Sequence, residues 1–201
     1  MTEQKTPQET EEIFKSFIAI PKNIPDKQFF FCPVGFVGTG KTTVAKPISD
    51  RFGLLRISSD ELRKILKENN LDFSPLKEII LKIAKEFAER GYSISFDMDC
   101  GNPETKTAIE ELAKKLDAKI VWVHVDTPED YVINGFINDA QYRSWLTNDP
   151  QKMIDNYHEQ KERRAKENTH FDFLCTFDTS SPGLGRQINE CCEKINKYLI
   201  N

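Results

Sequence analysis

Two spacings of apolar residues alternate along the chain. Nearly continuous apolar runs predict strands that are covered on both faces of a sheet. They are Gln28–Val34, Tyr92–Phe96, Lys119–Val125 and Phe173–Phe177, together with the shorter and less continuous Leu54–Ile57. Between these runs, apolar residues return every three or four positions, which predicts helices with one buried face. The alternation predicts an α/β domain with a mostly parallel, five-stranded central sheet flanked by helices.

The helical spacing is plainest after Ser74, where a stripe runs from Leu76 to Phe87 and Gly91 follows as a stop. Further helices are predicted at Thr10–Ile18, Thr42–Phe52, Ile109–Leu116 and Ile188–Leu199. Several helices are predicted to begin where a capping residue precedes proline, because proline lacks an N–H that would be unpaired there anyway. These pairs are Ser74-Pro75, Asn102-Pro103, Thr127-Pro128 and Asp149-Pro150.

A long polar stretch interrupts the alternation. Asn134–His170 contains no strand signal, which predicts a helical excursion, or lid, over about residues 128–170. No repeat and no linker divides the chain, so residues 1–201 are expected to form a single domain. Pro33 lies inside the first strand and lacks a ladder donor, which predicts a local irregularity there.

Composition and charge narrow the class of protein. Of 201 residues, 38% are hydrophobic and 30% are charged, and the mean hydropathy is −0.54. The most apolar stretch, Phe29–Gly38, is about half of what a membrane crossing needs, and the polar start of the chain is not a secretory signal. A cytoplasmic protein without a membrane partner is expected. The net charge of −4 argues against coating long nucleic acid, although docking on one nucleic-acid end stays open.

The five cysteines carry no metal-binding or redox motif. They are Cys32, Cys100, Cys175, Cys191 and Cys192. Their odd number, in a chain without an export signal, predicts reduced packing thiols and no disulfide partner.

The segment Gly35–Thr42 matches the pattern G-x-x-x-x-G-K-[ST] at every fixed position, between a predicted strand and a predicted helix. Glycines let successive backbone amides turn toward one anion, and the helix N-terminus adds its positive dipole end. Lys41 is expected to reach the β- and γ-phosphates and the Thr42 hydroxyl to ligate Mg²⁺. The alternative is a glycine-rich turn without a ligand. The expected nucleotide-binding residues are Gly35, Gly38, Thr39, Gly40, Lys41, Thr42 and Thr43.

A second candidate site follows the second predicted strand. In the segment Ser58–Lys64, Ser58 and Glu61 have the spacing of a capping box, which is the simpler interpretation. A capping box requires neither Asp60 nor Arg63. Because ligands of parallel sheets bind beyond the carboxyl ends of the strands, Asp60 is placed to take a proton from an attacking hydroxyl. Arg63, one helical turn further, is placed to grip an anionic part of the acceptor.

A third candidate is Asp97, at the end of the third predicted strand. It stands after an apolar run, as does the Walker B acid that positions Mg²⁺ or its waters. The alternative is a cap or turn aspartate before Asn102, since aspartate is common at strand-to-helix junctions.

Taken together, these motifs resemble the P-loop kinases of the polynucleotide kinase, zeta toxin and chloramphenicol phosphotransferase type, over about residues 28–200. The resemblance rests on GFVGTGKTTVAKPI, SSDELRK, FDMD, DTPEDY and FDTS. It implies the P-loop NTPase fold with a helical lid, and ATP with Mg²⁺. It further implies that Asp60 is the general base, that Arg63 contacts the acceptor, and that adenine packs near Asp178, Thr179 and Ser180.

One feature departs from that family. Its members usually carry two lid arginines, and the corresponding positions here are Asn134 and Asn138. Neither asparagine can neutralise charge during phosphoryl transfer. Arg143, Arg163 and Arg164 are the candidate substitutes, with Arg143 preferred because Arg163 and Arg164 lie in a mixed-charge segment typical of a solvated helix face. The candidate catalytic residues are therefore Lys41, Asp60, Arg63 and Arg143.

The leading hypothesis is an ATP-dependent kinase that phosphorylates a hydroxyl of a nucleotide, a nucleic-acid 5′ end or a small metabolite. A nucleotide-binding protein with little or no phosphotransferase activity, or an NTP hydrolase, is the alternative because the lid arginines are missing. A GTPase switch is disfavoured because the chain has no N-K-x-D motif and no D-x-x-G after the third strand. A motor ATPase is disfavoured because no second acid clearly stands beside Asp97.

Overall fold

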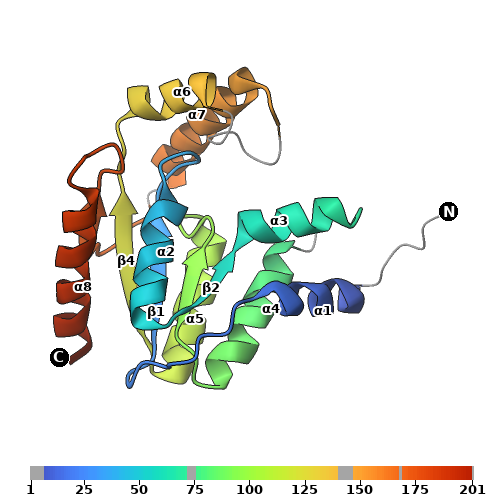
Figure 1. Cartoon of the computed structure of the whole chain (residues 1–201), viewed down its shortest axis with the longest axis vertical. Helices are drawn as coiled ribbons and strands as arrows, with labels where there is room; N and C mark the ends of the chain where they lie inside the picture. Colours follow the sequence, from blue (N-terminus) through green and yellow to red (C-terminus); the bar gives the residue numbers. More distant parts are fainter. Residues whose placement is uncertain (1–6, 72–75, 140–146, 168, 201) are drawn as a thin grey trace.

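A computed structural model describes residues 7–71, 76–139, 147–167 and 169–200. Its central sheet has five parallel strands in the order β2-β3-β1-β4-β5 (Figure 1). They are β1 (Phe29–Val34), β2 (Leu55–Ser58), β3 (Ile94–Asp97), β4 (Lys119–Val125) and β5 (Cys175–Phe177). The predicted five-stranded parallel sheet is confirmed, and most of the strand ends differ from the expected ones by one or two residues.

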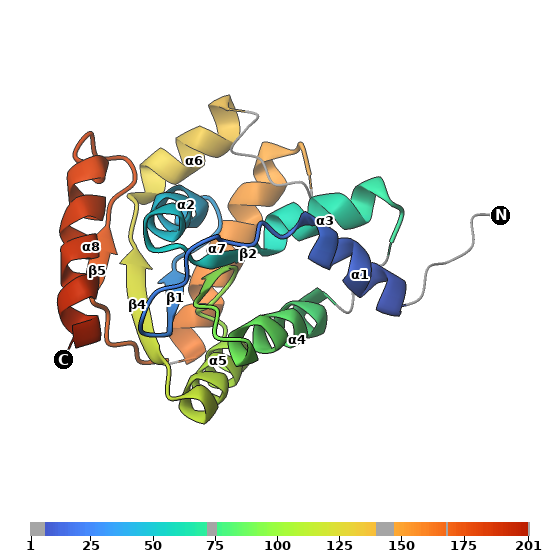
Figure 2. The same cartoon turned by 60° about the horizontal axis from the view of Figure 1, so that its bottom comes forward.

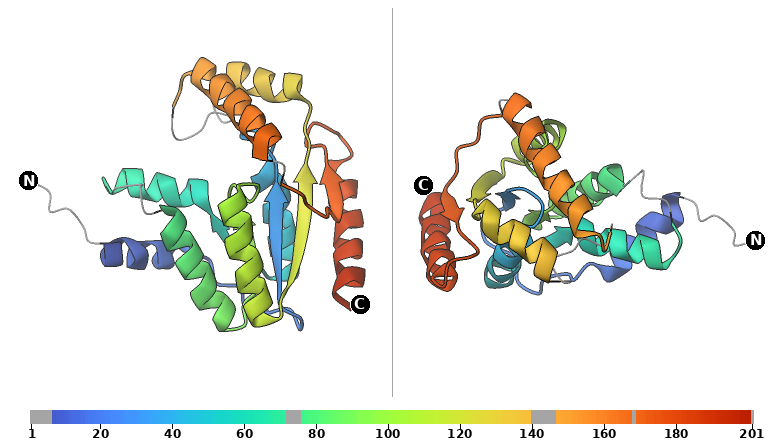
Figure 3. Two further views of the ribbon diagram at one scale, coloured as in Figure 1. Left: turned by 180° about the vertical axis from the view of Figure 1, so that it is seen from behind. Right: turned by 90° about the horizontal axis from the view of Figure 1, so that it is seen from above.

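Helices cover both faces of the sheet. One face carries α2 (Lys41–Phe52) and α8 (Leu184–Ile200), and the other carries α4 (Leu76–Glu89) and α5 (Pro103–Leu116), beside α1 (Pro7–Phe17) and α3 (Ser59–Glu68) (Figures 1 and 3). Side chains of β1 alternate between the two cores: Phe29 and Phe31 pack with α2 and α8, whereas Phe30 packs with α4 and α5. Burial on both faces explains why β1 is apolar throughout. In the described part of the chain, no helix has the length and apolarity to cross a membrane.

Two further helices, which we call the lid pair, lie beyond the carboxyl ends of the strands (Figures 1 and 3), and one of them passes behind the sheet in the view of Figure 2. They are α6 (Glu129–Asn138) and α7 (Pro150–Glu167). A small core of their own joins Phe136 of α6 to Met153 and Tyr157 of α7, and Phe36 and Val37 pack against it. The predicted helical excursion is therefore present, and it touches the segment that follows β1.

Two of the predicted helix caps are confirmed. The side chain of Asn102 accepts a hydrogen bond from the N–H of Thr105 at 3.1 Å, and that of Asp149 accepts one from Gln151 at 3.0 Å. Thr127 is not a cap, because its hydroxyl is used elsewhere, as described below. The predicted cap at Ser74 lies outside the described residues.

Pro33 interrupts the sheet on one side only. Pairing with β4 continues through Pro33, opposite Val123, and Val34. The register with β3 covers Phe30 and Phe31 and ends before Pro33. The missing N–H of proline is therefore accommodated where β1 has already parted from β3, and the irregularity predicted from the sequence is limited to that side.

Two of the five cysteines are paired. Cys175 on β5 and Cys191 on α8 form a disulfide, with Cα atoms 6.0 Å apart, within the usual range for such a bond. The expectation of reduced thiols without a disulfide partner is wrong for this pair. The packing of α8 on β5 brings them together, and no sequence motif marks that contact. Cys32, Cys100 and Cys192 are free and buried.

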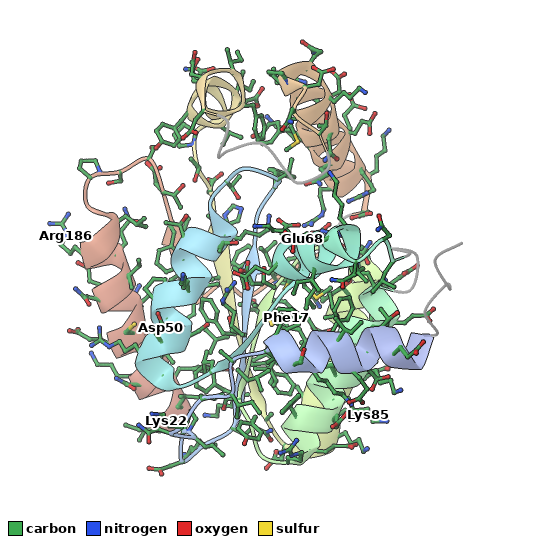
Figure 4. All side chains as sticks on the ribbon, turned by 45° about the vertical axis from the view of Figure 1, so that its right-hand side comes forward. Phe17, Lys22, Asp50, Glu68, Lys85 and Arg186 are labelled. Atoms are coloured by element: carbon green, nitrogen blue, oxygen red, sulfur yellow. A yellow bond between two sulfur atoms is a disulfide. The ribbon has the colours of Figure 1, made fainter. Side chains whose placement is uncertain are left out.

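The core predicts unequal effects for two phenylalanines of α1. Phe14 is fully buried, whereas Phe17, labelled in Figure 4, is 61% exposed. Phe14→Ala should lower the free energy of unfolding by about 3 kcal/mol, and Phe17→Ala by less than about 0.5 kcal/mol. Urea denaturation of both variants measures the difference. Equal losses would show that α1 is not packed against α3 and α4 as described.

Candidate functional site

The candidate residues meet at the carboxyl edge of the sheet, where β1, β2 and β3 end. A cavity of about 640 Å³ opens there. Parallel sheets bind ligands at this edge, because loops from neighbouring strands converge on it. The cavity is lined by Lys41 and Thr42 of the phosphate loop (residues 35–42), Asp60 and Arg63 of α3, Asp97 at the end of β3, Asp99 after it, and Gln160 and Arg163 of α7.

The phosphate loop is held in a glycine-dependent shape from two sides. Gly38 has φ of +78° and Gly40 has φ of +88°, a left-handed conformation that favours glycine. A Cβ on Gly38 would overlap the ring of Phe136 in α6. A Cβ on Gly40 would come within 2.8 Å of the side chain of Thr179, which follows β5. Gly40, a fixed glycine of the motif, and Gly38, at one of its variable positions, thus stand where the loop has no room for a side chain.

Two threonine hydroxyls fix the loop from behind. Thr127 and Thr179 each donate to the carbonyl oxygen of Thr39 at 2.9 Å, and the two hydroxyl oxygens lie 2.9 Å apart. Thr127 follows β4 and Thr179 follows β5, so the segments after these two strands support the loop. Sequence reasoning assigned Thr127 to a helix cap and missed this role, which no local pattern marks.

Lys41 bends back over the phosphate loop. Its Nζ donates to the carbonyl oxygens of Gly35 at 3.1 Å and Phe36 at 2.8 Å. Burial lowers the pKa of Lys41, and the negative charges of Asp99, Asp60 and Asp97 oppose that shift. An ammonium group held by two carbonyl oxygens of the phosphate loop, beside the N-terminus of α2, is well placed to bind an incoming polyanion such as a nucleotide phosphate.

Asp97 and Thr42 stand together at the floor of the cavity. Thr42 Oγ1 donates to Asp97 Oδ1 at 3.1 Å. The two side chains offer hard oxygen donors of the kind that Mg²⁺ binds, and Mg²⁺ usually takes its remaining ligands from phosphate and water. Among the described residues, no group of three or more His, Cys, Asp or Glu side chains could enclose a metal ion without such help. The pair therefore fits a magnesium ion that arrives with a nucleotide.

Arg56 on β2 is a charged group of this site that the sequence analysis missed. Its Nη1 lies 2.6 Å from Asp97 Oδ2, and its Nη2 pairs with the carboxylate of Glu61. The Asp97 side chain is only 3% exposed and that of Arg56 15%. Burial raises the pKa of Asp97, while Arg56 and Thr42 act against that rise. Arg56 thus joins Asp97 to the first turn of α3.

The start of α3 serves as a cap and also borders the cavity. The N–H of Glu61 donates to Ser58 Oγ at 3.4 Å, which confirms the predicted helix cap. Asp60 and Arg63 line the cavity and pair with each other, Arg63 Nη1 lying 2.9 Å from Asp60 Oδ1. The Asp60 side chain is 66% exposed and that of Arg63 is 35% exposed. The two residues predicted to handle an acceptor are therefore adjacent and open to the cavity.

Most of the other predicted site residues lie outside the cavity lining. Thr43 lines the cavity, whereas Asp178, Thr179 and Ser180 do not. Thr179 supports the loop, and the Asp178 carboxylate accepts from the N–H of Ser180 at 2.9 Å and from its hydroxyl at 2.6 Å. Arg143 lies outside the described residues.

On the lid pair, α7 rather than α6 supplies polar groups to the cavity. Asn134 and Asn138 lie on α6, where Asn138 Nδ2 donates to the carbonyl of Asn134 at 3.0 Å, and neither lines the cavity. Gln160 and Arg163 of α7 do line it. Gln160 Oε1 accepts from the N–H of Val37 at 3.0 Å, so α7 contacts the phosphate loop directly.

The site combines a strand, a glycine-bounded anion-binding loop with a lysine, and a helix. It lies at the carboxyl edge of a parallel sheet, with an acid on the neighbouring strand. This combination defines a P-loop protein. The chain belongs to the family whose model is described as an AAA domain, which matches residues 31–135. No curated protein matches the chain in sequence.

Solved structures with the same fold include several kinases. An APS kinase from Mycobacterium tuberculosis, in complex with AMPPNP and APS, is 16% identical, with a TM-score of 0.54, over 86% of this chain and 99% of that one. A gluconokinase from Sinorhizobium meliloti is 14% identical (TM-score 0.55; 89% and 97% covered). A shikimate kinase from Bacteroides thetaiotaomicron is 17% identical (TM-score 0.55; 86% and 99% covered). These likenesses establish the P-loop kinase fold.

The buried ion pair of Arg56 and Asp97 predicts that replacing Arg56 lowers the free energy of unfolding much more than replacing Glu61, the exposed acid that Arg56 also contacts. Arg56→Met leaves Asp97 buried without its cation and should lower the free energy of unfolding by about 3 kcal/mol. Glu61→Gln removes only the 61% exposed partner and should cost less than about 1 kcal/mol. Urea denaturation at pH 7 measures both. A loss below about 1 kcal/mol for Arg56→Met would contradict the buried pair.

Proposed function

We propose that the protein is an ATP-dependent kinase that transfers the γ-phosphate to a hydroxyl group of a small, negatively charged acceptor. The observation that carries the proposal is the shared cavity: Asp60 and Arg63 open onto the same space as Lys41 and the phosphate loop. A protein that only bound a nucleotide would need the loop but not an exposed acid and arginine beside it. The motif resemblance to polynucleotide kinases, zeta toxins and chloramphenicol phosphotransferases supports the same class.

The phosphate loop binds the donor in this proposal. Backbone amides between Gly35 and Thr42 hold the phosphates, and Lys41 exchanges its carbonyl partners for phosphate oxygens. Thr42 and Asp97 would hold Mg²⁺, which supplies charge neutralisation of the phosphates when bound. The adenine is proposed to lie near Asp178–Ser180, by the resemblance, and the absence of N-K-x-D favours ATP over GTP as the donor.

Asp60 and Arg63 act on the acceptor. Asp60 takes the proton of the attacking hydroxyl, because an exposed carboxylate at the cavity wall can reach it directly. Arg63 holds Asp60 in place at 2.9 Å and has further N–H groups to bind an anionic part of the acceptor. The acid and the arginine share one helical turn, so binding the acceptor also orients its hydroxyl toward the base.

The acceptor class is proposed from the cavity and from the structural neighbours. A volume of about 640 Å³ lies within the range of small-molecule sites. The neighbours are named as kinases of APS, gluconate and shikimate, and each name denotes a small hydroxyl-bearing acceptor. A nucleic-acid 5′ end is the second candidate, favoured by the motif resemblance, and it would present its sugar hydroxyl to the same base.

Three variants separate donor binding from chemistry. Asp60→Asn should bind Mg²⁺-ATP as wild type does, because the phosphate loop is untouched, while kcat for phosphate transfer falls roughly 10²–10⁴-fold. Lys41→Ala should lose most ATP binding, since a charged contact to phosphate contributes about 1.5–3 kcal/mol. Glu68→Gln, an exposed acid near the end of α3 (Figure 4), serves as the control and should match wild type.

The measurements are calorimetric titration with Mg²⁺-ATP and initial rates with radiolabelled ATP and a panel of small hydroxyl-bearing anions. Wild-type rates in Asp60→Asn would reduce Asp60 to a residue of the helix start. Equal ATP affinity in Lys41→Ala and wild type would contradict the phosphate loop as the donor site.

A further inference from the structure

One face of α7 contacts the phosphate loop. Tyr157 packs edge-on against Phe36, with ring centroids 5.5 Å apart. One turn further, Gln160 accepts from the N–H of Val37 at 3.0 Å. Residues three or four positions apart share a helix face, so the next residues on this face, Arg163 and Arg164, follow Gln160 toward the cavity and the segment after β3.

The two adjacent arginines have different surroundings. Arg164 pairs with Asp99 and is only 12% exposed, whereas Arg163 is 50% exposed, with Nη2 3.5 Å from Asp99 Oδ2. A Cβ on Gly101 would overlap the guanidinium of Arg164, so the glycine makes room for the buried arginine. Arg163, and not Arg164, lines the cavity.

This arrangement leaves Asp99 neutralised even when Arg163 moves away. The carboxylate already has Arg164 as a close, buried partner, so Arg163 can exchange its longer contact to Asp99 for a phosphate oxygen. The other acid near Arg163 is Glu167, 3.4 Å from its Nε, and Arg164 also lies within 3.8 Å of Glu167. One arginine therefore fixes the helix while its neighbour is available to a ligand.

Two other basic residues of α7 pair with α6 and do not face the cavity. Lys161 pairs with Glu129 of α6 at 2.5 Å, and His158 pairs with the same acid at 3.2 Å. Lys161 is 53% exposed, similar to Arg163, but it does not line the cavity. Lys161 and His158 thus join the two lid helices, whereas Arg163 faces the cavity.

We propose that Arg163 is a catalytic residue of this protein: its guanidinium leaves Asp99 and contacts the γ-phosphoryl group only as that group is transferred, where it neutralises the developing charge, with Arg164, Asp99 and Gln160 positioning α7. The inference rests on the proposed function for the presence of a transferred phosphate. It assigns to α7 the positive charge that α6 cannot supply, because Asn134 and Asn138 stand there. A guanidinium suits the task because its fork of N–H groups binds phosphate oxygens in pairs.

The test compares Arg163→Ala and Arg163→Lys with the matched control Lys161→Ala, which removes a cation of similar exposure from the same helix. For Arg163→Ala we expect the dissociation constant of Mg²⁺-ATP to stay within about threefold of wild type and the rate of γ-phosphate loss from ATP to fall roughly 10³-fold. Arg163→Lys should recover part of that rate, and Lys161→Ala should equal wild type. Thermal melts establish that each variant is folded.

A second readout does not depend on turnover. Mg²⁺-ADP with aluminium fluoride mimics the transferring phosphoryl group, and transition-state mimics bind more tightly than ground-state ligands. Wild type should bind this mixture more tightly than Mg²⁺-ADP alone, and Arg163→Ala should lose most of that gain while binding Mg²⁺-ADP normally. If Arg163→Ala keeps the gain and the wild-type rate, the inference is overturned.

Failure of the proposed function gives a different result. Phosphate released only to water, at a rate that still depends on Arg163, would overturn the kinase and leave the role of Arg163 in place. Label transfer to a hydroxyl acceptor at equal rates in wild type and Arg163→Ala would support the kinase and overturn the role of Arg163.

Discussion

The phosphate loop keeps its shape only because neighbouring elements occupy both of its sides. Phe136 of α6 lies where a side chain on Gly38 would be, and Thr179 lies where one on Gly40 would be. The carbonyl of Thr39 is fixed by two threonine hydroxyls. Since the loop depends on contacts from α6, from the end of β4 and from the segment after β5, the sheet order and the lid pair are conditions for the site rather than additions to it.

Charge is balanced locally around the cavity, in a way that suits an anionic ligand. Burial lowers the pKa of Lys41 and raises that of Asp97, so each group is held in an environment that disfavours its charged form. Arg56 compensates Asp97 from β2, and Arg164 compensates Asp99 from α7. Because Asp97 and Asp99 each have an arginine partner, the other cations at the cavity wall can bind the phosphates of a nucleotide. Thr42 and Asp97 can then provide oxygen ligands for Mg²⁺.

Much of this arrangement follows from the sequence. Nearly continuous apolar runs predicted four of the five strands, and a shorter, less continuous run predicted β2, because strands buried on both faces are mostly apolar. The phosphate loop was recognisable because its glycines and lysine are close together in the chain. The same holds for Asp60 and Arg63, which lie on one turn of helix, and the structure places both beside the loop.

What the sequence could not reveal depends on contacts between distant segments. Arg56 looks like an ordinary polar position in a short strand until β3 brings Asp97 beside it. The disulfide of Cys175 and Cys191 requires α8 to pack on β5. The mixed charges of α7 predict a solvated face, yet helix packing turns Arg163 toward the cavity and Lys161 toward α6. Periodicity states which residues share a face, but not what that face meets.

The central claim is that the γ-phosphate leaves the phosphate loop for an organic hydroxyl. Its most direct test is to follow the label of γ-labelled ATP in wild-type protein with Mg²⁺ and a panel of small hydroxyl-bearing anions, and to separate phosphate esters from inorganic phosphate. The account predicts label in a phosphate ester, formed with Mg²⁺ and not with a chelator. Label that stays on bound ATP, or that appears only as inorganic phosphate, would contradict it.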